Sequence, residues 1–277
     1  MSLYGSADES DFSIGRGRKI PVNTKITDHN SKIIEIALLA VTIAFVAAFI
    51  IGCSNSFSPA EGETYNPTIN PSDFVAKIDN KYFPLTPGTT FIYRGKAEGG
   101  TERNEVYVTH KTKKIIGVTC IEVEDKVWVN DKLSEMTLDW YAQDKDGNVW
   151  YFGEDSKGYE KGVVVSTKGS WEAGVDGAKP GIIMLANPEV GKSYRQEYYK
   201  GEAEDMAEVL SLNESVIVPY GPFDNCLKTK DWTPLESGVV ENKYFCPGIG
   251  EVLSVTVKGG SERTELTEIR TESRRDE

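Results

Sequence analysis

The sequence predicts an all-β domain, a single antiparallel meander curled into a barrel or half-barrel and preceded by a signal or anchor helix. Strand-like stretches of alternating apolar and polar residues recur about every 8–12 residues, separated by short glycine-rich turns. The absence of alternating helical patterns argues against a parallel sheet. About ten strands in one sheet would curl, and closing the sheet removes its exposed edges.

The turns that divide the strands are recognisable in the sequence. Residues 91–108 predict a hairpin around Gly99-Gly100, and Asp146-Gly147-Asn148 predicts another because Asp-Gly supplies the positive φ angles of a type I′ turn. Residues 202–212 contain good helix formers, so a single helix is an alternative there. We favour a strand, because residues 211–218 continue the segment without a break.

The front of the chain predicts an envelope anchor. Residues 36–52 form an apolar run without charge, and every basic residue of the leader precedes it, so the remainder of the chain is expected to be exported. The run ends Ile50-Ile51-Gly52-Cys53, which resembles the lipobox of prokaryotic lipoproteins. We therefore expect residues 1–53 to be a signal peptide or membrane anchor and Cys53 to be lipidated; the alternative is an uncleaved signal-anchor helix with an incidental Cys53.

Composition divides the rest of the chain and bounds its partners. Residues 54–72 are rich in Ser, Asn, Pro and acidic residues and predict a disordered tether. Residues 73–270 form the predicted β domain, and residues 271–277 are a charged tail. The charges of residues 1–52 cancel, so the net charge of −12 belongs to the exported part. Such a domain repels phosphate backbones, and we expect no nucleic-acid partner.

Most catalytic classes lack their residues in this chain. The two histidines are His29, in the leader, and His110, in a lysine-rich segment, and there is no GxSxG, Walker or dinucleotide-binding pattern. The ligands for a His/Cys metal site are too few. The Asp144–Asn148 segment has the wrong spacing for a calcium loop. We expect no cofactor, no metal and no catalysis.

The glycine-rich stretch 169–184 holds the candidate site. Its Trp171 is either a ligand platform or a plug that fills the mouth of the barrel. Arg195 and Glu197 share one face of their strand by period-2 alternation, and we expect them to pair. Carboxylates in and after this stretch could instead support a hydrolase. The candidate ligand-binding residues are Trp171, Glu172, Asp176, Arg195 and Glu197.

Register arithmetic predicts one disulfide. If residues 226–232 and 239–246 form a hairpin centred on residue 236, opposite residues have numbers that sum to 472. Cys226 and Cys246 meet this condition, and facing residues of an antiparallel pair lie within disulfide range. Export would place both thiols in an oxidising environment, which favours the bond. Cys120, among branched apolar residues, is expected to be a buried free thiol.

Three blocks resemble an uncharacterised family of secreted or lipid-anchored prokaryotic all-β proteins. They are GSWEAGVDGAKPGIIM (169–184), SYRQEYY (193–199) and ENKYFCPGIGEV (241–252), and the resemblance extends over about residues 75–270. Where that family often reads Tyr-Tyr-Ala-Pro-Gly-Val-Gly, residues 244–250 read YFCPGIG. The resemblance implies no activity. A looser likeness to curved-sheet lipoprotein carriers of the envelope is architectural only.

These observations lead to a functional hypothesis with two alternatives. The chain is expected to be a cell-surface lipoprotein whose β domain is a non-catalytic binding or interaction module. Its expected partners are the membrane, through a lipid or the N-terminal helix, and an unknown small molecule or envelope ligand. The alternatives are a carboxylate-dependent hydrolase of envelope polysaccharide, using Glu172, Asp176 or Glu197, and a structural surface component.

Overall fold

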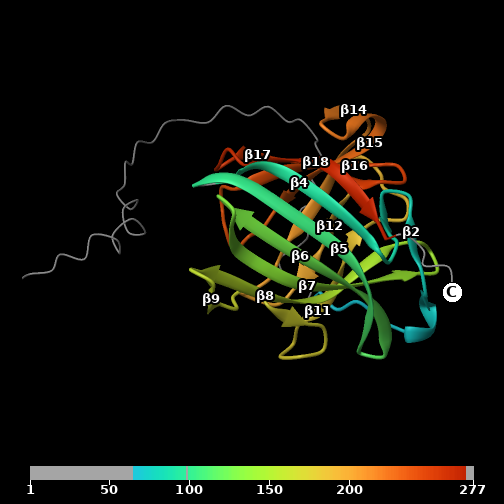
Figure 1. Cartoon of the computed structure of the whole chain (residues 1–277). Coiled ribbons are helices and arrows are strands. Elements are labelled where there is room, and N and C mark those ends of the chain that lie inside the picture. Colours follow the sequence, from blue (N-terminus) through green and yellow to red (C-terminus); the bar gives the residue numbers. More distant parts are fainter. Residues whose placement is uncertain (1–64, 98, 273–277) are drawn as a thin grey trace, which may run out of the picture. The chain divides into compact units, whose positions relative to one another are not determined.

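The computed structural model describes residues 65–97 and 99–272, which form a nearly closed antiparallel barrel (Figure 1). Sixteen strands make up one sheet, and β2 and β3 form a separate two-stranded sheet. The predicted all-β class is confirmed. The predicted anchor and Cys53 lie outside the described residues. Within the described ranges, no helix is long and apolar enough to span a membrane.

The wall of the barrel consists of long strands joined by hairpins. In chain order these are β4 (Thr89–Ala97), β5 (Gly100–Ile115), β6 (Val118–Val129), β7 (Lys132–Asp144), β8 (Val149–Glu160), β14 (Met206–Val218), β15 (Gly221–Trp232), β16 (Val240–Cys246), β17 (Gly250–Lys258) and β18 (Arg263–Thr271). Shorter elements precede and interrupt this series. They are η1 (Pro71–Asp73), β1 (Phe74–Val75), β2 (Ile78–Asn80), β3 (Phe83–Leu85), β9 (Val163–Ser166), β10 (Trp171–Glu172), β11 (Lys179–Met184), β12 (Ser193–Arg195) and β13 (Glu197–Tyr198).

The barrel closes in two places. On one side, β18 pairs antiparallel with β4, which joins the last long strand of the chain to the first. On the other side, a single short segment bridges the two outer strands. Within that segment β12 pairs with β14 through Tyr194 and Ala207, whereas β13 pairs with β11 through Glu197 and Pro180. Gln196 is the residue at which the segment changes partner.

The predicted turns and strands are found in the structure. Residues 91–108 form the β4–β5 hairpin. Gly147 has a φ of +95° in the β7–β8 turn, and its amide donates to the Asp144 carbonyl at 3.0 Å. β14 begins at Met206, so the segment with good helix formers continues as a strand. Its pairing with β15 explains why tertiary context overrides helix propensity there.

The register of β15 and β16 confirms the predicted disulfide. Leu227 lies opposite Phe245, and Lys228 lies opposite Tyr244, so the residue numbers sum to 472 as expected. Cys226 and Cys246 are joined by a disulfide, with their Cα atoms 4.2 Å apart. Cys120 is buried and free, as predicted.

Both faces of the sheet contribute to hydrophobic clusters. Period-2 alternation on β6 sends Ile121 and Val123 to the larger cluster and Val118 and Cys120 to the smaller one. The smaller cluster also contains Trp140 and Phe152 from the neighbouring strands β7 and β8. It is completed by Ala173 and Ala178 from the glycine-rich stretch.

The β2–β3 hairpin caps one end of the barrel. Asn80 fixes this cap, because its backbone amide donates to the Gln143 side chain at 2.8 Å and its side-chain amide donates to the carbonyls of Gly147 and Leu185 at 2.8 and 3.2 Å. Asn80 is buried, so these hydrogen bonds are shielded from water. They bring β3, with Phe83, over the interior of the barrel.

The folded part includes residues that the sequence assigned to the tether. The Tyr65 hydroxyl donates to the Pro180 carbonyl at 2.8 Å, and its ring packs edge-on against Tyr198 with centroids 5.6 Å apart. The Lys179 ammonium donates to the Tyr65 carbonyl at 2.5 Å. Tyr65, within the range 54–72 that was expected to be a tether, therefore contacts the strands β11 and β13. Composition alone could not reveal that a single tyrosine packs against the closing strands.

Candidate functional site

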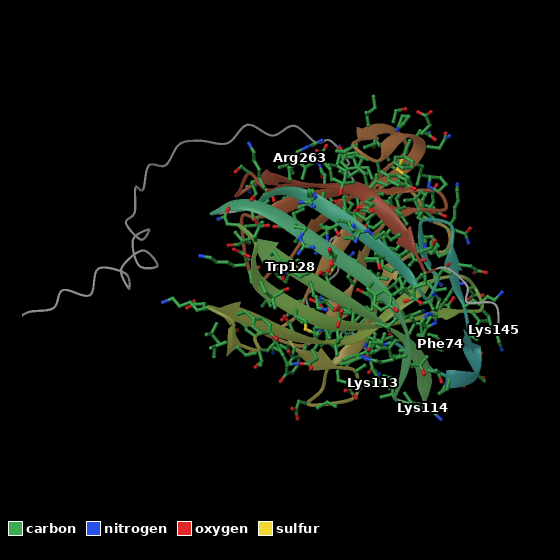
Figure 2. All side chains as sticks on the ribbon, viewed as in Figure 1. Phe74, Lys113, Lys114, Trp128, Lys145 and Arg263 are labelled. Carbon is green, nitrogen blue, oxygen red and sulfur yellow. A yellow bond between two sulfur atoms is a disulfide. The ribbon has the colours of Figure 1, made fainter. Side chains whose placement is uncertain are left out.

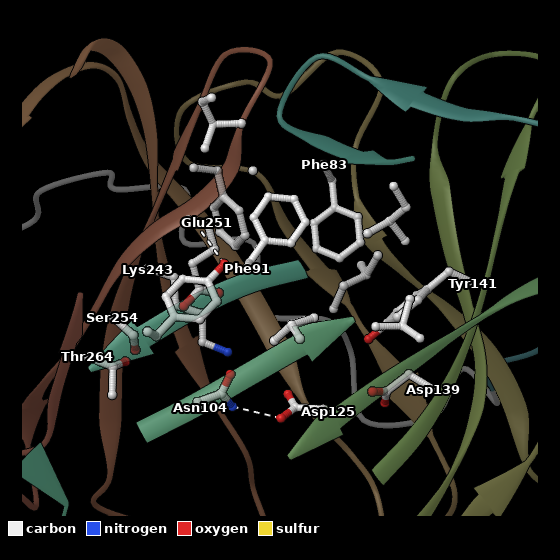
Figure 3. Close-up of a pocket in the computed structure, with 18 of the residues that line it drawn as sticks. Phe83, Phe91, Asn104, Asp125, Asp139, Tyr141, Lys243, Glu251, Ser254 and Thr264 are labelled. Carbon is white, nitrogen blue, oxygen red and sulfur yellow. Dashed lines mark hydrogen bonds between the residues drawn. The ribbon is translucent and has the colours of Figure 1, made fainter. Parts of the chain in front are cut away.

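A cavity of about 350 Å³ lies inside the barrel, beneath the β2–β3 cap (Figure 3). Its walls come from strands on both sides of the β18–β4 closure, so no single hairpin makes it. The lining residues are Phe83, Pro84, Leu85, Phe91, Tyr93, Glu102, Asn104, Val106, Val123, Asp125, Asp139, Tyr141, Ile183, Gln196, Glu241, Lys243, Phe245, Ile249, Gly250, Glu251, Ser254 and Thr264.

The end of the cavity near the cap is aromatic. The ring of Phe83 lies edge-on to Tyr141, with centroids 5.5 Å apart, and 6.4 Å from the ring of Phe245. Phe91 completes this wall from β4, and Figure 3 shows it beside Phe83. Such a surface binds apolar groups with little loss of side-chain entropy, because the rings are already held.

Farther from the cap, the lining becomes polar along the same strands. The inward positions of β16 run from Phe245 through Lys243 to Glu241, and those of β7 run from Tyr141 to Asp139. Because inward positions alternate with period 2, each strand contributes both an apolar and a polar part to the lining. The cavity is therefore amphipathic along the strand direction.

The polar part has many more acids than bases. Lys243 is its one basic residue. The ammonium of Lys243 lies 3.9 Å from carboxylate oxygens of both Asp231 and Glu241. Burial alone would lower the pKa of Lys243, but Asp231 and the other carboxylates outweigh burial and raise it, so the ammonium stays charged. The acidic lining residues are Glu102, Asp125, Asp139, Glu241 and Glu251.

Burial changes the protonation of several of these acids. It raises the pKa of Asp139 to about 7 and that of Glu251 to about 7. It also raises the pKa of Asp125 well above its usual range, with Asp139 adding to the effect. These carboxyl groups therefore lose their protons closer to neutral pH than ordinary Asp and Glu side chains do, because burial disfavours their ionised forms.

Two hydrogen-bonded groups reach the polar end, one through Asn104 and Asp125 and the other through Asp139. The Asn104 side-chain amide donates to Asp125 at 2.7 Å, and its carbonyl oxygen Oδ1 is buried without a hydrogen-bond partner. Beside them, the Tyr151 hydroxyl oxygen lies 2.5 Å from Asp139 Oδ1 and 3.1 Å from Glu154 Oε2. We call Asp139, Tyr151 and Glu154 the Tyr151 triad. Both groups offer acceptor oxygens in excess of donors.

The predicted platform residue Trp171 is buried, with 5 % of its surface exposed. It lies opposite Glu154 in the β8–β10 pairing, its ring is edge-on to Tyr151 at 5.3 Å, and its indole N–H donates to Glu197 at 2.9 Å. The structure thus brings Trp171 and Glu197 together. This position fits the plug alternative for Trp171, because the ring fills space beside the Tyr151 triad.

The other three candidates each have a different environment. Glu172 accepts from Lys113 at 2.7 Å, and Figure 2 labels this lysine on the lower side of the barrel. Asp176 is exposed in a turn, with a φ of +49°. Arg195 lies 3.8 Å from Glu204, so the expected Arg195–Glu197 pair is wrong. The reason is the change of pairing partner between β12 and β13, which ends the regular alternation on which that expectation rested.

None of the five candidates predicted from the sequence lines the cavity. The residues that do include Asn104, Asp125 and Lys243, for which the sequence predicts no role. A signal was present on β16, where Glu241 and Lys243 share a face with Phe245. In the residues that the structure describes, no three His, Cys, Asp or Glu side chains are arranged to hold a metal ion.

Comparisons with known proteins add little to this description. No protein-family model and no curated protein matches the chain. Among solved structures, the chain is similar to a candidate lipoprotein from Parabacteroides distasonis ATCC 8503, with 14% sequence identity and a TM-score of 0.40. The match covers 69% of this chain and 99% of that one. We infer no function from a likeness this weak.

Proposed function

We propose that the barrel is a non-catalytic binding protein of the cell envelope that holds a small amphipathic cation in its cavity. One observation supports this most strongly, namely that an aromatic wall and a carboxyl-rich wall face the same space of about 350 Å³. Ligand sites of proteins usually combine an apolar enclosure of about 300–1,000 Å³ with a few polar groups that fix orientation.

The charge of the lining selects the polar end of the ligand. Five carboxyl groups and one ammonium line the cavity, and burial raises the pKa of several of these carboxyl groups. A cation would stabilise their ionised forms and an anion would not, so the lining favours a cation over an anion. The unpaired carbonyl oxygen of Asn104 also needs a donor. An ammonium or guanidinium supplies both positive charge and N–H donors. The apolar part of the ligand would rest on Phe83 and Phe91.

The volume limits the size of the ligand. The cavity equals the volume of about a dozen water molecules, at ~30 Å³ each in the liquid. A ligand of about ten non-hydrogen atoms, such as an arylalkylamine, matches that space. A polymer segment does not, which supports small-molecule binding over polysaccharide hydrolysis. The ion pair of Glu172 with Lys113 and the hydrogen bond of Glu197 with Trp171 also argue against a shared catalytic role.

The envelope location remains a proposal based on Cys53, because that residue lies outside the described ranges. The Cys226–Cys246 disulfide supports it, since such bonds persist mainly in oxidising compartments. A lipid-anchored binding protein would hold its ligand outside the cytoplasmic membrane.

A matched set of three ligands tests the proposal. We expect the full chain, in non-ionic detergent at pH 7, to bind 2-phenylethylamine at least tenfold more tightly than 2-phenylethanol, and to bind 3-phenylpropionate undetectably by calorimetry. Each ligand carries the same ring, so only the polar group differs. Failure of the amine to bind, or tighter binding of the carboxylate, would refute the proposal.

Three variants localise the binding. Asp125→Asn keeps the shape of the side chain and should weaken amine binding at least tenfold. Val106→Phe, which adds a ring inside the cavity, should weaken all three ligands. Glu268→Gln is the matched control, because Glu268 is an exposed acid on β18 that pairs with Arg270 and lies outside the cavity. Equal effects of Asp125→Asn and Glu268→Gln would mean that the amine binds elsewhere.

A further inference from the structure

The Tyr151 triad contains more hydrogen-bond contacts than the phenol alone can make. The hydroxyl oxygen of Tyr151 contacts both Asp139, at 2.5 Å, and Glu154, at 3.1 Å. A neutral phenol has one proton and donates to one carboxylate only. If the other carboxyl group is protonated, it donates to the phenol oxygen, and the second contact is then a full hydrogen bond as well. The geometry therefore accommodates one additional proton in the triad.

The surroundings of the triad favour retention of that proton. The titratable groups that act on Asp139 and Glu154 are themselves acidic. They are Asp125 of β6, Glu135 and Tyr141 of β7 and Glu197 of β13. No basic group of the described ranges acts appreciably on Asp139 or Glu154. Burial and these neighbours raise the pKa of Glu154 to about 9.

The triad connects a residue that lines the cavity with one that does not. Asp139 lines the cavity and is 8 % exposed, whereas Glu154 is absent from the lining. Tyr151 lies between them. The proton resides either on Glu154, with Tyr151 donating to Asp139, or on Asp139, with Tyr151 donating to Glu154. Transfer of two protons along the hydrogen bonds, one from the protonated carboxyl group to Tyr151 and one from Tyr151 to the other carboxylate, interconverts the two arrangements.

We propose that the Tyr151 triad stores a proton while the cavity is empty and releases it to solvent when an organic cation binds beside Asp139. This inference rests on the proposed function and names how the same site is regulated. One positive charge enters and one proton leaves, so the charge inside the barrel is conserved. No covalent bond other than O–H changes. The affinity for the cation therefore increases as pH rises. It levels off at the pH where the triad of the unliganded chain has already lost its proton.

Proton release can be counted directly. We expect the full chain at pH 6 to release about one proton for each 2-phenylethylamine bound, measured by calorimetry in two buffers that differ in ionisation enthalpy. Linkage then requires the association constant to rise by up to tenfold per pH unit below pH 7. Glu154→Gln should bind the amine without releasing a proton. Its amide donates to Tyr151, and Tyr151 donates permanently to an ionised Asp139. Glu268→Gln should release the same number of protons as wild type.

The outcomes separate this inference from the proposed function. Amine binding without proton release by the wild-type chain at any pH from 5 to 8 would overturn the stored proton and leave the binding function intact. No amine binding would overturn both. A second measurement needs no ligand, because the infrared difference spectrum of wild type minus Glu154→Gln at pH 7 should contain the C=O band of a protonated carboxyl group. Its absence would also refute the stored proton.

Discussion

Replacing Glu154 by Gln should make the barrel more stable, and the gain should grow with pH. Burial raises the pKa of Glu154 from 4.5 in a model compound to about 9 in the folded chain. Between these values the folded state binds more protons than the unfolded state, so unfolding releases a proton. The wild-type chain therefore loses stability as pH rises from about 4.5 to about 9, whereas a neutral glutamine causes no such loss.

The magnitude follows from the same shift. A rise from 4.5 to about 9 corresponds to about 6 kcal/mol, at ~1.4 kcal/mol for each pH unit. Water from the adjacent cavity and relaxation of β8 recover part of this cost when Glu154 ionises. We therefore expect the stability difference between Glu154→Gln and wild type to increase by about 2–3 kcal/mol from pH 4 to pH 9.

Urea unfolding at half-unit pH steps, with the disulfide intact, measures this difference. Other buried acids, including Asp139 and Glu251, also lower the free energy of unfolding as pH rises. They are present in both chains, so to a first approximation their contributions cancel in the difference between Glu154→Gln and wild type. Glu268→Gln is again the control, since that carboxyl group is exposed on β18. A difference that does not change with pH, or that falls as pH rises, would show that Glu154 is ionised in the folded chain and that the triad lacks its extra proton.

Three further predictions concern other parts of the chain. Trp171→Ala should lower the unfolding free energy by about 3–5 kcal/mol, as truncation of a buried Trp does. Trp171→Phe should lower it by about 1–3 kcal/mol, because Glu197 loses its hydrogen-bond donor. Unchanged urea midpoints for both variants would place Trp171 outside the core. Replacing Cys226 and Cys246 together by Ala should cost about 3 kcal/mol, since the bond closes a loop with a sequence separation of 20, and an unaltered thermal midpoint would contradict this. Cys53→Ser should abolish lipid attachment in the native host; a variant equal to wild type in mass and detergent partitioning would exclude lipidation.

Alternation and turn chemistry were sufficient to predict the barrel and one precise register. Cys226 and Cys246 could be paired because a short polar loop separates two uninterrupted strands. The middle of that loop sets the register of the hairpin, and the register determines which residues lie opposite each other. The sequence did not distinguish helix from strand as clearly for the segment that contains Met206, because its residues favour a helix in isolation. Its pairing with β15 decides the matter, and such pairing is not visible in local sequence.

The site escaped prediction for a physical reason. In a solid barrel the inward positions are apolar, so polar residues such as Asp125 and Lys243 are assigned to the solvent face. Here the barrel is hollow, and the polar positions face an internal space. Trp171 stands in a glycine-rich stretch, where an aromatic residue suggests an exposed platform. In the structure Gly153 of β8 instead allows the backbone at Trp171 to approach β8 closely, since a Cβ at Gly153 would lie 2.4 Å from the Trp171 carbonyl oxygen.

The pairing of β4 with β18 has a consequence for the order of events during synthesis. The Thr267 hydroxyl donates to the Ile92 carbonyl across a sequence separation of 175 residues. A nascent chain therefore exposes the free edge of β4 until β18 emerges, and an open strand edge invites pairing with other chains. Thr264 of β18 also lines the cavity. The enclosure is thus incomplete until β18 has been made and paired, and a chain truncated before β18 would have both an open strand edge and an incomplete cavity wall.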